Sequence, residues 1–493
     1  MSYATDMTSD TMSGKAEQQP LQLRVNVPLH FVGIGGVGMS GLAKILLEAG
    51  YAVSGSDVSD NAYIQSLRTL GAVIHIGHQA ENVPSNAVLI VSSSINRQNP
   101  EIAQALDRQQ AIYHRSELLR EILQGQPTGH QSPIGITGTH GKTTITGMTG
   151  LALKAAGLDP SIIVGGKMPQ LNTNAIWGES KKYAVAELDE SDGTILQYQP
   201  ALSVVANLEL DHADHYTNGL QGVMDTFRTY LHALKPGSKV FYNVTCPNTK
   251  LLLAENPTHV EAILVAPDEV FTGQESQTTY WLKNARHYGR GCYQGYMYRN
   301  AKLLGELSMS VPGKHNLFNA LFAAAVGDQL GGDFDALAQS LNQFTGMGRR
   351  FEKVGTMNKA LLIDDYAHHP SEVLVTLKAA RESLQGSGGR VIAIFQPHRY
   401  TRLQALWDEF MTCFGDADLL YLTDVYAAHE TEIPGITSSA LAEKVTRPKA
   451  HYVPQTPGFS ELQAVLLKEI QPGDLVISMG AGNITQLLRN WEA

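Results

Sequence analysis

The sequence has little of what extracellular and membrane proteins need. Its 493 residues include only three cysteines, Cys246, Cys292 and Cys413. They are far apart and odd in number, so we expect neither a disulfide framework nor a thiolate metal site. No run approaches the ~18 apolar residues of a membrane span, and the polar segment Met1 to Pro20 lacks the apolar stretch of a secretory signal. We therefore expect a cytoplasmic protein with no membrane partner.

Positive charge is also scarce. There are 37 lysines and arginines against 47 aspartates and glutamates, a formal net charge of −10. A negative chain is a poor general binder of nucleic acid, so we expect no nucleic-acid partner. Glycine, in contrast, is abundant: the chain has 46 glycines, where the usual share would give about 35. This excess suggests glycine-rich ligand loops.

From Pro28 onward, short apolar strands alternate with helical segments, a pattern typical of parallel α/β sheets. We expect three series of strands: residues 30–34, 51–56, 72–76, 87–92 and 111–114; then 134–137, 161–165, 183–188, 202–209 and 239–243; then 360–366, 390–396, 417–426 and 474–482. Helices are expected at 39–50, 142–157, 223–234, 315–330, 371–384 and 402–414, and antiparallel hairpins at 278–309.

At about 150 residues per domain, the length favours roughly three domains. The segment 124–133 is polar and contains proline and glycine, so it predicts a linker. Residues 346–352 predict a second junction. We expect a disordered tail at 1–21 and domains at 22–128, 129–347 and 348–493.

A first glycine-rich loop, Gly33 to Ser40, follows a predicted strand and opens a helix. Glycines there let the backbone approach a diphosphate, whose charge meets the free N–H groups of the helix. Asp57, nineteen residues beyond Gly38, ends the next strand and could bind a ribose hydroxyl. The pattern alone does not separate NAD from a nucleotide sugar, and a tight turn needed only for packing is the alternative.

The second loop, Gly138 to Thr144, reads GTHGKTT and again joins a strand to a helix. Ile136 stands where the strict phosphate-loop pattern has glycine. The remaining parts are present: amides for the phosphates, Lys142 for the β/γ oxygens, and Thr143 or Thr144 for Mg²⁺. This loop predicts ATP binding.

Acidic side chains follow two neighbouring strands of the second series, at residues 187–192 (ELDESD) and 207–212 (NLELDH). Open α/β sheets place ligands at such carboxyl ends, and carboxylates are ligands that Mg²⁺ prefers. A solvated loop is the alternative for each. Two phosphate loops in one chain favour an enzyme that uses ATP to activate a group carried on a nucleotide.

Eight motifs occur in one order: GIGGVGMSG, GTHGKTT, AELDESDG, NLELDHADHY, PGKHNLFNA, DDYAHHP, QPHRYTR and DVYAAHE. From about Pro28 to the C-terminus the chain thereby resembles the Mur ligases, the ATP-dependent amide-forming enzymes of peptidoglycan synthesis. The resemblance implies an α/β protein of three domains: a Rossmann-like UDP-substrate domain at 22–128, a central P-loop ATPase domain at 129–347 and a C-terminal Rossmann-like amino-acid-binding domain at 348–493.

The resemblance also assigns roles to matching residues. The UDP-substrate site would comprise Gly35, Gly36, Gly38, Met39, Ser40, Ser56, Asp57, Ser92 and Arg115. The ATP site would comprise Gly138, Thr139, His140, Gly141, Lys142, Thr143, Thr144, Asn316, Asn319, Arg350 and Asp365. Metal would be held by Thr143, Glu187 and His212, and the amino acid by His398, Arg399 and Arg402. Lys142, Glu187, His212, His369 and Arg399 would be catalytic.

The implied reaction joins L-alanine to the lactyl carboxylate of UDP-N-acetylmuramate through an acyl phosphate, with ATP and two Mg²⁺ ions, for which Mn²⁺ could substitute. We expect a monomer or weak homodimer. Two alternatives stay open: a related ligase that adds a preformed tripeptide, and an NAD-dependent oxidoreductase fused to a P-loop regulator. The second leaves DDYAHHP and QPHRYTR unexplained. His429 stands where the family usually has glycine, and Asn483 where aspartate is common.

Overall fold

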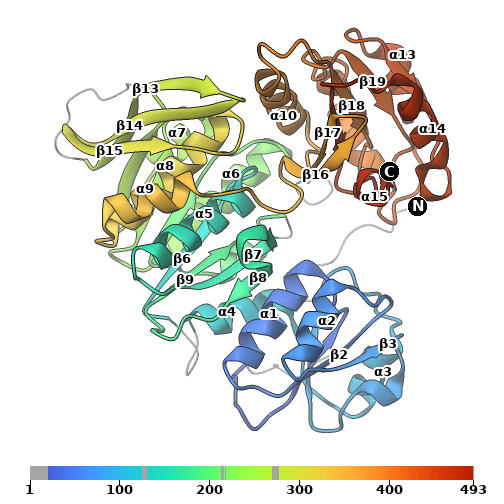
Figure 1. Ribbon diagram of the computed structural model, residues 1–493. Helices are drawn as coiled ribbons and strands as arrows, with labels where there is room; N and C mark the ends of the chain where they lie inside the picture. The colour runs from blue at the N-terminus through green and yellow to red at the C-terminus, as the bar shows by residue number, and fades with distance from the viewer. Residues whose placement is uncertain are drawn as a thin grey trace.

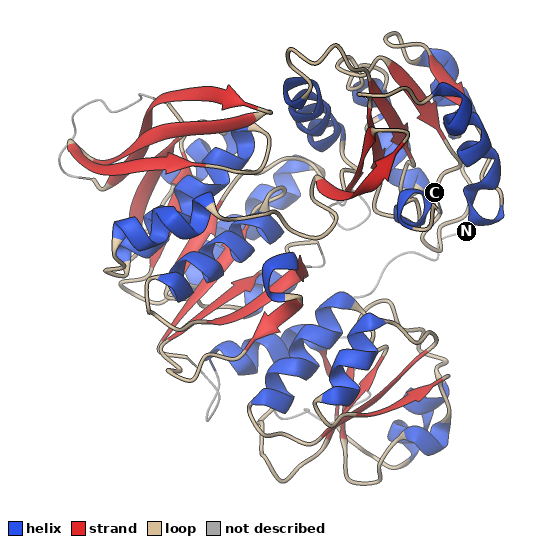
Figure 2. Ribbon diagram, viewed as in Figure 1, coloured by secondary structure: helices blue, strands red, loops and turns tan. Residues whose placement is uncertain are grey.

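The computed structural model describes residues 20–124, 130–191, 193–211, 216, 218–268 and 277–491. They form three sheets, each with its own covering helices, in the order of the chain (Figure 1). Figure 2 shows that helices lie on both faces of the sheets. Within these residues, no helix is both long and apolar enough to cross a membrane.

The first sheet is wholly parallel, with strand order β3-β2-β1-β4-β5. Its strands are β1 (Leu29–Val32), β2 (Val53–Asp57), β3 (Val73–Ile76), β4 (Val88–Val91) and β5 (Ile112–His114), and its helices are α1 (Val37–Glu48), α2 (Ala62–Thr69), α3 (Pro100–Asp107) and α4 (Arg115–Gln124). The order reverses at β1, so the loop after β1 lies where such sheets open a ligand crevice.

The second sheet has ten strands in the order β15-β14-β13-β12-β11-β10-β6-β9-β7-β8. They are β6 (Ser132–Thr137), β7 (Ser161–Met168), β8 (Thr173–Ile176), β9 (Tyr183–Glu187), β10 (Leu202–Val205), β11 (Lys239–Asn243), β12 (Glu261–Ala266), β13 (Thr279–Gly289), β14 (Cys292–Arg299) and β15 (Lys302–Ser308). The helices are α5 (Lys142–Ala155), α6 (Leu220–Ala233), α7 (Pro247–Ala254), α8 (Lys314–Gln329) and α9 (Phe334–Asn342). Since β6 lies between β10 and β9, three carboxyl ends meet around the loop that opens α5.

The third sheet has the order β16-β17-β21-β18-β19-β20 and is parallel except for β16. Its strands are β16 (Glu352–Met357), β17 (Ala360–Asp365), β18 (Val391–Phe395), β19 (Leu419–Leu422), β20 (Ala450–Tyr452) and β21 (Leu475–Met479), and its helices are α10 (Pro370–Ser383), α11 (Tyr400–Ala405), α12 (Trp407–Phe410), α13 (Ser438–Lys444), α14 (Ser460–Glu469) and α15 (Thr485–Arg489).

The first and second sheets share one continuous apolar core, which runs from Phe31 and Leu42 to Phe227 and Tyr242. At its edge α1 packs against β7 and β8, and Lys44 Nζ donates to Thr173 Oγ1 at 2.7 Å and to the Ala175 carbonyl at 2.9 Å. The first glycine loop therefore has a fixed place relative to the second sheet.

The predicted hairpins at 278–309 are present as β13, β14 and β15. The expected linker 124–133 was too long at both ends, because Gln124 belongs to α4, and Ser132 and Pro133 belong to β6, where the Pro133 carbonyl accepts a hydrogen bond from the Ala201 N–H. Its residues 125–129 lie outside the described residues. The expected helix 402–414 is broken at Leu406, whose ψ is 28°. Leu403, Leu406 and Phe410 are all buried. The helical spacing of apolar residues therefore continues through the break, and the sequence pattern does not indicate it.

Candidate active site

The phosphate loop joins β6 to α5 and takes conformations that favour glycine. Gly138 has φ +120° and Gly141 φ +85°. A Cβ on Gly138 would lie 2.7 Å from the Asn207 carbonyl oxygen. Asn207, just beyond β10, also fixes the loop, since its Oδ1 accepts from the His140 N–H at 2.8 Å and its carbonyl accepts from the Thr139 N–H at 3.0 Å. The loop is thus held open at the amino end of α5, where a helix attracts anions.

Lys142 lies across this loop. Its Nζ donates to the Gly138 carbonyl at 2.7 Å, to the Thr139 carbonyl at 3.3 Å and to Glu190 Oε1 at 2.9 Å. Burial alone would lower the pKa of Lys142, but the carboxylates of Glu190, Asp189 and Glu187 raise it overall. Lys142 therefore carries a positive charge at the centre of the loop. The sequence indicates the acidic cluster 187–192 as a candidate ligand site, but it does not identify Glu190 as the partner of Lys142.

Thr143 and Glu187 lie side by side. Thr143 Oγ1 donates to Glu187 Oε1 at 3.1 Å, and the Gly165 N–H donates to Glu187 Oε2 at 3.0 Å. A hydroxyl beside a carboxylate is a donor set that fits Mg²⁺, so these two residues fit the predicted metal site. The third predicted ligand, His212, lies outside the described residues, as does Asp192 of the first acidic segment.

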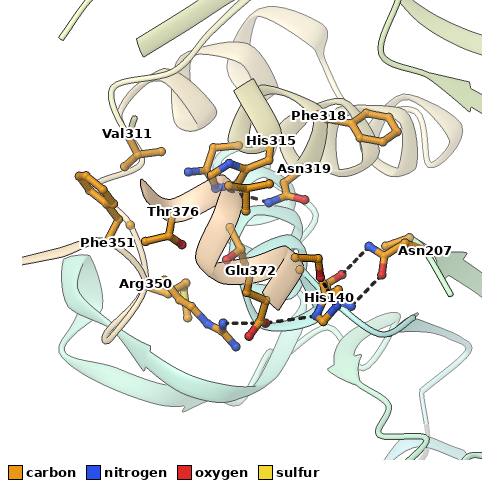
Figure 3. Close-up of a pocket in the computed structure, with 18 of the residues that line it drawn as sticks. His140, Asn207, Val311, His315, Phe318, Asn319, Arg350, Phe351, Glu372 and Thr376 are labelled. Atoms are coloured by element: carbon orange, nitrogen blue, oxygen red, sulfur yellow. Dashed lines mark hydrogen bonds and ion pairs between the residues drawn. The ribbon is translucent and has the colours of Figure 1, made fainter. Parts of the chain in front are cut away.

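A cavity of about 240 Å³ opens between the phosphate loop, α8 and the first turns of α10. Figure 3 shows its walls, with His315 and Asn319 on one side and Arg350, Glu372 and Thr376 on another. The aromatic part of the lining consists of Phe318, Phe322, Phe344 and Phe351. Sequence reasoning missed these rings, because they come from three separate segments.

Two predicted ATP residues, Asn316 and Asn319, line this cavity. Asn316 Nδ2 donates to the Pro312 carbonyl at 2.7 Å, and Asn319 Nδ2 donates to Asn316 Oδ1 at 3.3 Å. Burial lowers the pKa of the neighbouring His315 to about 4, so this ring is neutral. The wall offers amide groups beside apolar rings, a combination that suits a flat heterocycle.

His140 of the phosphate loop reaches the third-sheet region. Its Nδ1 lies 3.2 Å from Glu372 Oε1, and its Nε2 lies 3.0 Å from Ser371 Oγ and 3.4 Å from Glu209 Oε2. Arg350 Nη1 lies 3.5 Å from the same Glu372 oxygen (Figure 3). Burial alone would lower the pKa of His140, but Glu209 and Glu372 raise it to about 9. Sequence reasoning gave His140 no such bridging role.

Asp365 lines the cavity from the end of β17, and His369 lies four residues further along, at the start of α10. The two carboxylate oxygens of Asp365 accept backbone N–H groups from Phe351 at 2.6 Å and Ala367 at 2.7 Å. Burial raises the pKa of Asp365 to about 6, against the lowering effect of Arg350. His369 caps α10, with Nδ1 2.7 Å from Ser371 Oγ. Burial lowers its pKa, so the ring is neutral at pH 7.

The predicted amino-acid residues gather before and within α11. Arg402 is buried, and its Nε and Nη2 both donate to Asp211 Oδ1, at 3.0 and 2.9 Å. Its Nη1 lies 3.2 Å from His398 Nδ1. His398 stacks on Tyr426, and burial, followed by the charge of Arg402, lowers the pKa of His398 to about 3. Arg399 precedes α11 with φ +67°. Arg402 is therefore bound to a carboxylate of the second-sheet region, and Asp211 is a partner that sequence reasoning missed.

The first glycine loop is closed by Asp57. Its Oδ2 accepts the Gly35 N–H at 2.8 Å and its Oδ1 accepts the Ser59 N–H at 3.1 Å. The side chains of Met39 and Ser40 are buried, and the Ser40 hydroxyl accepts from Asn174 Nδ2 at 3.0 Å. Ser40 therefore lies at the interface with the second sheet, and Met39 belongs to the apolar core that the first two sheets share. Gly36 and Gly38 lie at the start of α1, where they expose backbone and no side chain.

Ser56, Ser92 and Arg115 lie along the carboxyl edge of the first sheet or just beyond it. Ser92 Oγ is 2.8 Å from Ser94 Oγ, and Arg115 Nη2 is 3.7 Å from Asp189 Oδ2 in the second-sheet region. Ser56 Oγ donates to Glu101 Oε2 at 2.6 Å. Sequence reasoning missed this buried Glu101, because nothing around it in the sequence marks it as more than part of an ordinary helix.

Comparison with known proteins agrees with this arrangement of three units. Family models match in three successive segments: "Mur ligase family, catalytic domain" at residues 28–126, "Mur ligase middle domain" at 136–327 and "Mur ligase, glutamate ligase domain" at 349–482. A UDP-N-acetylmuramate–L-alanine ligase of Trichlorobacter lovleyi is 40% identical over 465 residues, which cover 93% of this chain and 96% of the relative. The chain belongs to the Mur ligase family.

Another relative of the same name, from Gloeobacter violaceus, is 40% identical over 462 residues, covering 93% of this Mur ligase and 94% of the relative. The crystal structure of a UDP-N-acetylmuramate–alanine ligase from Thermotoga maritima is 28% identical, with a TM-score of 0.75, over 94% of this chain and 98% of that one. A murein peptide ligase from Psychrobacter arcticus, 20% identical with a TM-score of 0.68 over 95% and 100% of the two chains, shares the fold. The predicted family, the α/β fold class and the ligase class are confirmed, and this Mur ligase is an ATP-dependent enzyme.

Proposed function

We propose that this Mur ligase joins L-alanine to the lactyl carboxylate of UDP-N-acetylmuramate, with ATP converted to ADP and phosphate. One observation carries the proposal. The chain aligns over 93% of its length with ligases that bear this name, and the alignment is long enough to include the loop that holds Lys142. The family assignment alone leaves the amino acid open, so L-alanine rests on the names of these relatives.

The carboxylate has to be activated before an amine can attack it, because oxide is a very poor leaving group. Transfer of the γ-phosphoryl group to the carboxylate gives an acyl phosphate, from which phosphate leaves readily. The obstacle is repulsion between the carboxylate and the anionic γ-phosphate. Lys142 carries its charge at the loop, where it would stabilise the charge that develops during transfer.

Thr143 and Glu187, together with His212 from the predicted set, would hold Mg²⁺ beside the phosphates, and the family resemblance favours two ions, with Mn²⁺ as a substitute. When bound, Mg²⁺ neutralises phosphate charge and orients the transferring group. The hydrogen bond from Thr143 Oγ1 to Glu187 Oε1 supports the proposal, because it places a hydroxyl and a carboxylate within 3.1 Å of each other.

We assign the cavity to ATP. The base would lie against the rings of Phe318 and Phe322 beside Asn316 and Asn319, while the loop 138–144 would receive the phosphates. Arg350 and Asp365 would close the site from the third-sheet region. Sealing such a cavity on both sides keeps water from the acyl phosphate.

We assign the first glycine loop to UDP-N-acetylmuramate, with domains at 22–128, 129–347 and 348–493 supplying the sugar nucleotide, ATP and amino-acid sites. The backbone of Gly35, Gly36 and Gly38 at the start of α1 supports a diphosphate site there. The bonds that Asp57 makes to Gly35 and Ser59 support a role in shaping the loop, besides any contact with ribose. Ser56, Ser92 and Arg115 border the same edge.

L-Alanine would approach from the third sheet, with His398, Arg399 and Arg402 near its carboxylate. An α-amine has a pKa of about 8, so about 10% is unprotonated at pH 7. A neutral His369 would be able to take up the proton of an attacking amine, which its lowered pKa supports. We further propose a cytoplasmic monomer or weak homodimer.

The decisive experiment measures phosphate release with ATP, Mg²⁺ and UDP-N-acetylmuramate, with L-alanine, glycine or the preformed tripeptide as acceptor. We expect release with L-alanine, and none when ATP or the UDP-sugar is omitted. Release with the tripeptide in place of L-alanine would assign the chain to the tripeptide-adding ligases. Thermal unfolding adds an independent test, since ATP and not NAD should raise the melting temperature.

A further inference from the structure

Two imidazoles and one carboxylate converge at the boundary between the phosphate loop and α10. His140, Glu209 and His369 each offer one ligand atom, and these three atoms all lie within 4.8 Å of one another. The carboxylate oxygen is 3.4 Å from the His140 nitrogen and 3.9 Å from the His369 nitrogen. None of the three belongs to the Mg²⁺ set of Thr143, Glu187 and His212.

The far side of each imidazole is held by an acceptor. His140 Nδ1 lies 3.2 Å from Glu372 Oε1, and His369 Nε2 lies 3.3 Å from the Leu210 carbonyl oxygen. These contacts place a proton on the outward nitrogens. His369 is neutral, so its inward nitrogen keeps a lone pair. The pKa of His140 is raised to about 9, so its inward nitrogen also carries a proton, which a bound metal ion displaces. Metal-binding histidines are oriented in this way in proteins. Ser371 Oγ lies 3.0 Å from the inward nitrogen of His140 and 2.7 Å from that of His369, so it borders the same point.

We propose that His140, Glu209 and His369 form a binding site for a divalent transition-metal ion such as Zn²⁺. Two imidazoles and one carboxylate are a Zn²⁺ ligand set, and the Ser371 hydroxyl or water completes four positions. Mg²⁺ prefers oxygen ligands, so the same residues select against it. The site is distinct from that of the Mg²⁺ ions in the proposed function.

The ion would bridge two parts of the chain. His140 belongs to the phosphate loop, Glu209 follows β10, and His369 is the cap of α10. A bound ion therefore fixes the phosphate loop to the third-sheet region. Since the loop has to admit and release nucleotide, Zn²⁺ inhibits turnover at saturating Mg²⁺.

The test is a Zn²⁺ titration of the full-length, nucleotide-free protein in competition with a chromophoric chelator, followed by Co²⁺ absorption spectra. We expect one tight equivalent of Zn²⁺ and a Co²⁺ spectrum of low coordination number. Glu209→Gln and His369→Gln should each weaken Zn²⁺ binding at least about tenfold. The matched controls, Glu255→Gln and His451→Gln, change exposed side chains elsewhere and should retain binding.

The variant Glu187→Gln distinguishes Zn²⁺ binding at this site from Zn²⁺ binding at the Mg²⁺ site. Loss of Zn²⁺ binding in Glu187→Gln, with binding retained in Glu209→Gln, would place the ion at Thr143 and Glu187 and overturn the proposal. Absence of a tight equivalent in the wild-type protein, or its retention in both site variants, would also overturn it. Glu209 is 42% exposed, so its replacement leaves the fold intact, and circular dichroism checks this for each variant.

Discussion

At the scale of single residues, replacement of Lys142 is the most direct test of the proposed ATP site. Lys142→Ala should lower the rate of phosphate release at least about 100-fold, because a positioned cation on a transferring phosphoryl group is lost. A coupled ADP-release assay measures this. Lys154→Ala, an exposed lysine in the last turn of the same helix, is the control and should keep its activity. Near wild-type turnover in Lys142→Ala would show that the phosphate loop takes no part in the reaction.

Replacement of Arg399 in the segment HRYTR tests the proposed amino-acid site. A charge-assisted hydrogen bond contributes about 1.5–3 kcal/mol, so Arg399→Ala should lower kcat/KM for L-alanine roughly 10- to 150-fold. The KM for ATP should change by no more than a few-fold. Steady-state kinetics with L-alanine and with ATP as the varied substrate check both values. Unchanged alanine kinetics, or a collapse of ATP binding instead, would mean that Arg399 lies outside the amino-acid site.

Contacts between site residues could be predicted where they depend on one loop or on neighbouring strands. Lys142 and Thr143 lie within one turn of α5, and Glu187 ends the strand paired with β6, so their proximity follows from sheet topology. His140 and Glu372 are 232 positions apart, and only the docking of two sheets brings them within 3.2 Å. No local pattern contains that information.

At the scale of elements, a buried carboxylate joins β1, β2 and α3. Glu101 Oε2 accepts from Ser56 at 2.6 Å and lies 3.4 Å from His30 Nε2, and Glu101 Oε1 accepts from Asn82 at 2.8 Å. Burial alone would raise the pKa of Glu101, but these hydrogen bonds lower it to about 2. The ionised carboxylate therefore stabilises the folded first sheet.

The pKa of Glu101 is lower in the folded protein than in the unfolded chain, so the free energy of unfolding decreases as the pH falls. The contribution of Glu101, on the order of 3 kcal/mol, is present above pH ~4.5 and is lost as the pH falls toward 2. At neutral pH, Glu101→Gln should lower the protection of the β1 and β2 amides against hydrogen exchange. In acid, the protection of the variant should fall less steeply than that of the wild type. Hydrogen exchange, corrected for intrinsic rates, measures this. Glu81→Gln changes an exposed neighbour and should match the wild type; equal protection in Glu101→Gln would contradict the assignment.

Most strands could be predicted, several of them because their apolar runs are buried on both faces. Strands β1, β4, β10 and β18 show this, because nearly all of their residues are buried. The structure adds four strands that were not predicted. One is β12, an interior strand between β11 and β13. The other three are β8, β16 and β20. These are edge strands with polar or exposed residues, such as Thr173 and Lys353, and their strand conformation comes from a single neighbour. Periodicity does not report pairing of that kind.

At the scale of the whole molecule, the third-sheet region contacts the second across the cavity through several charged side chains. One group is His140 with Glu372, and the other is Arg402 with Asp211. Contacts made of charges in place of an apolar core can separate and form again at modest cost in free energy. We infer that nucleotide entry and product release use motion of this region, with residues 346–351 as the hinge.

The Arg402–Asp211 ion pair offers a direct test of that inference. Both side chains are buried, and removal of one partner of a buried pair costs about 3–5 kcal/mol, because the remaining charge is left desolvated. Asp211→Asn should therefore shift the protein toward separated forms, seen as a larger radius of gyration in small-angle X-ray scattering. Asp225→Asn, which breaks an exposed pair with Arg228, is the control and should scatter like the wild type. If folded Asp211→Asn keeps the wild-type radius, the ion pair does not hold the two regions together, and the other charged contacts or the cavity walls must do so.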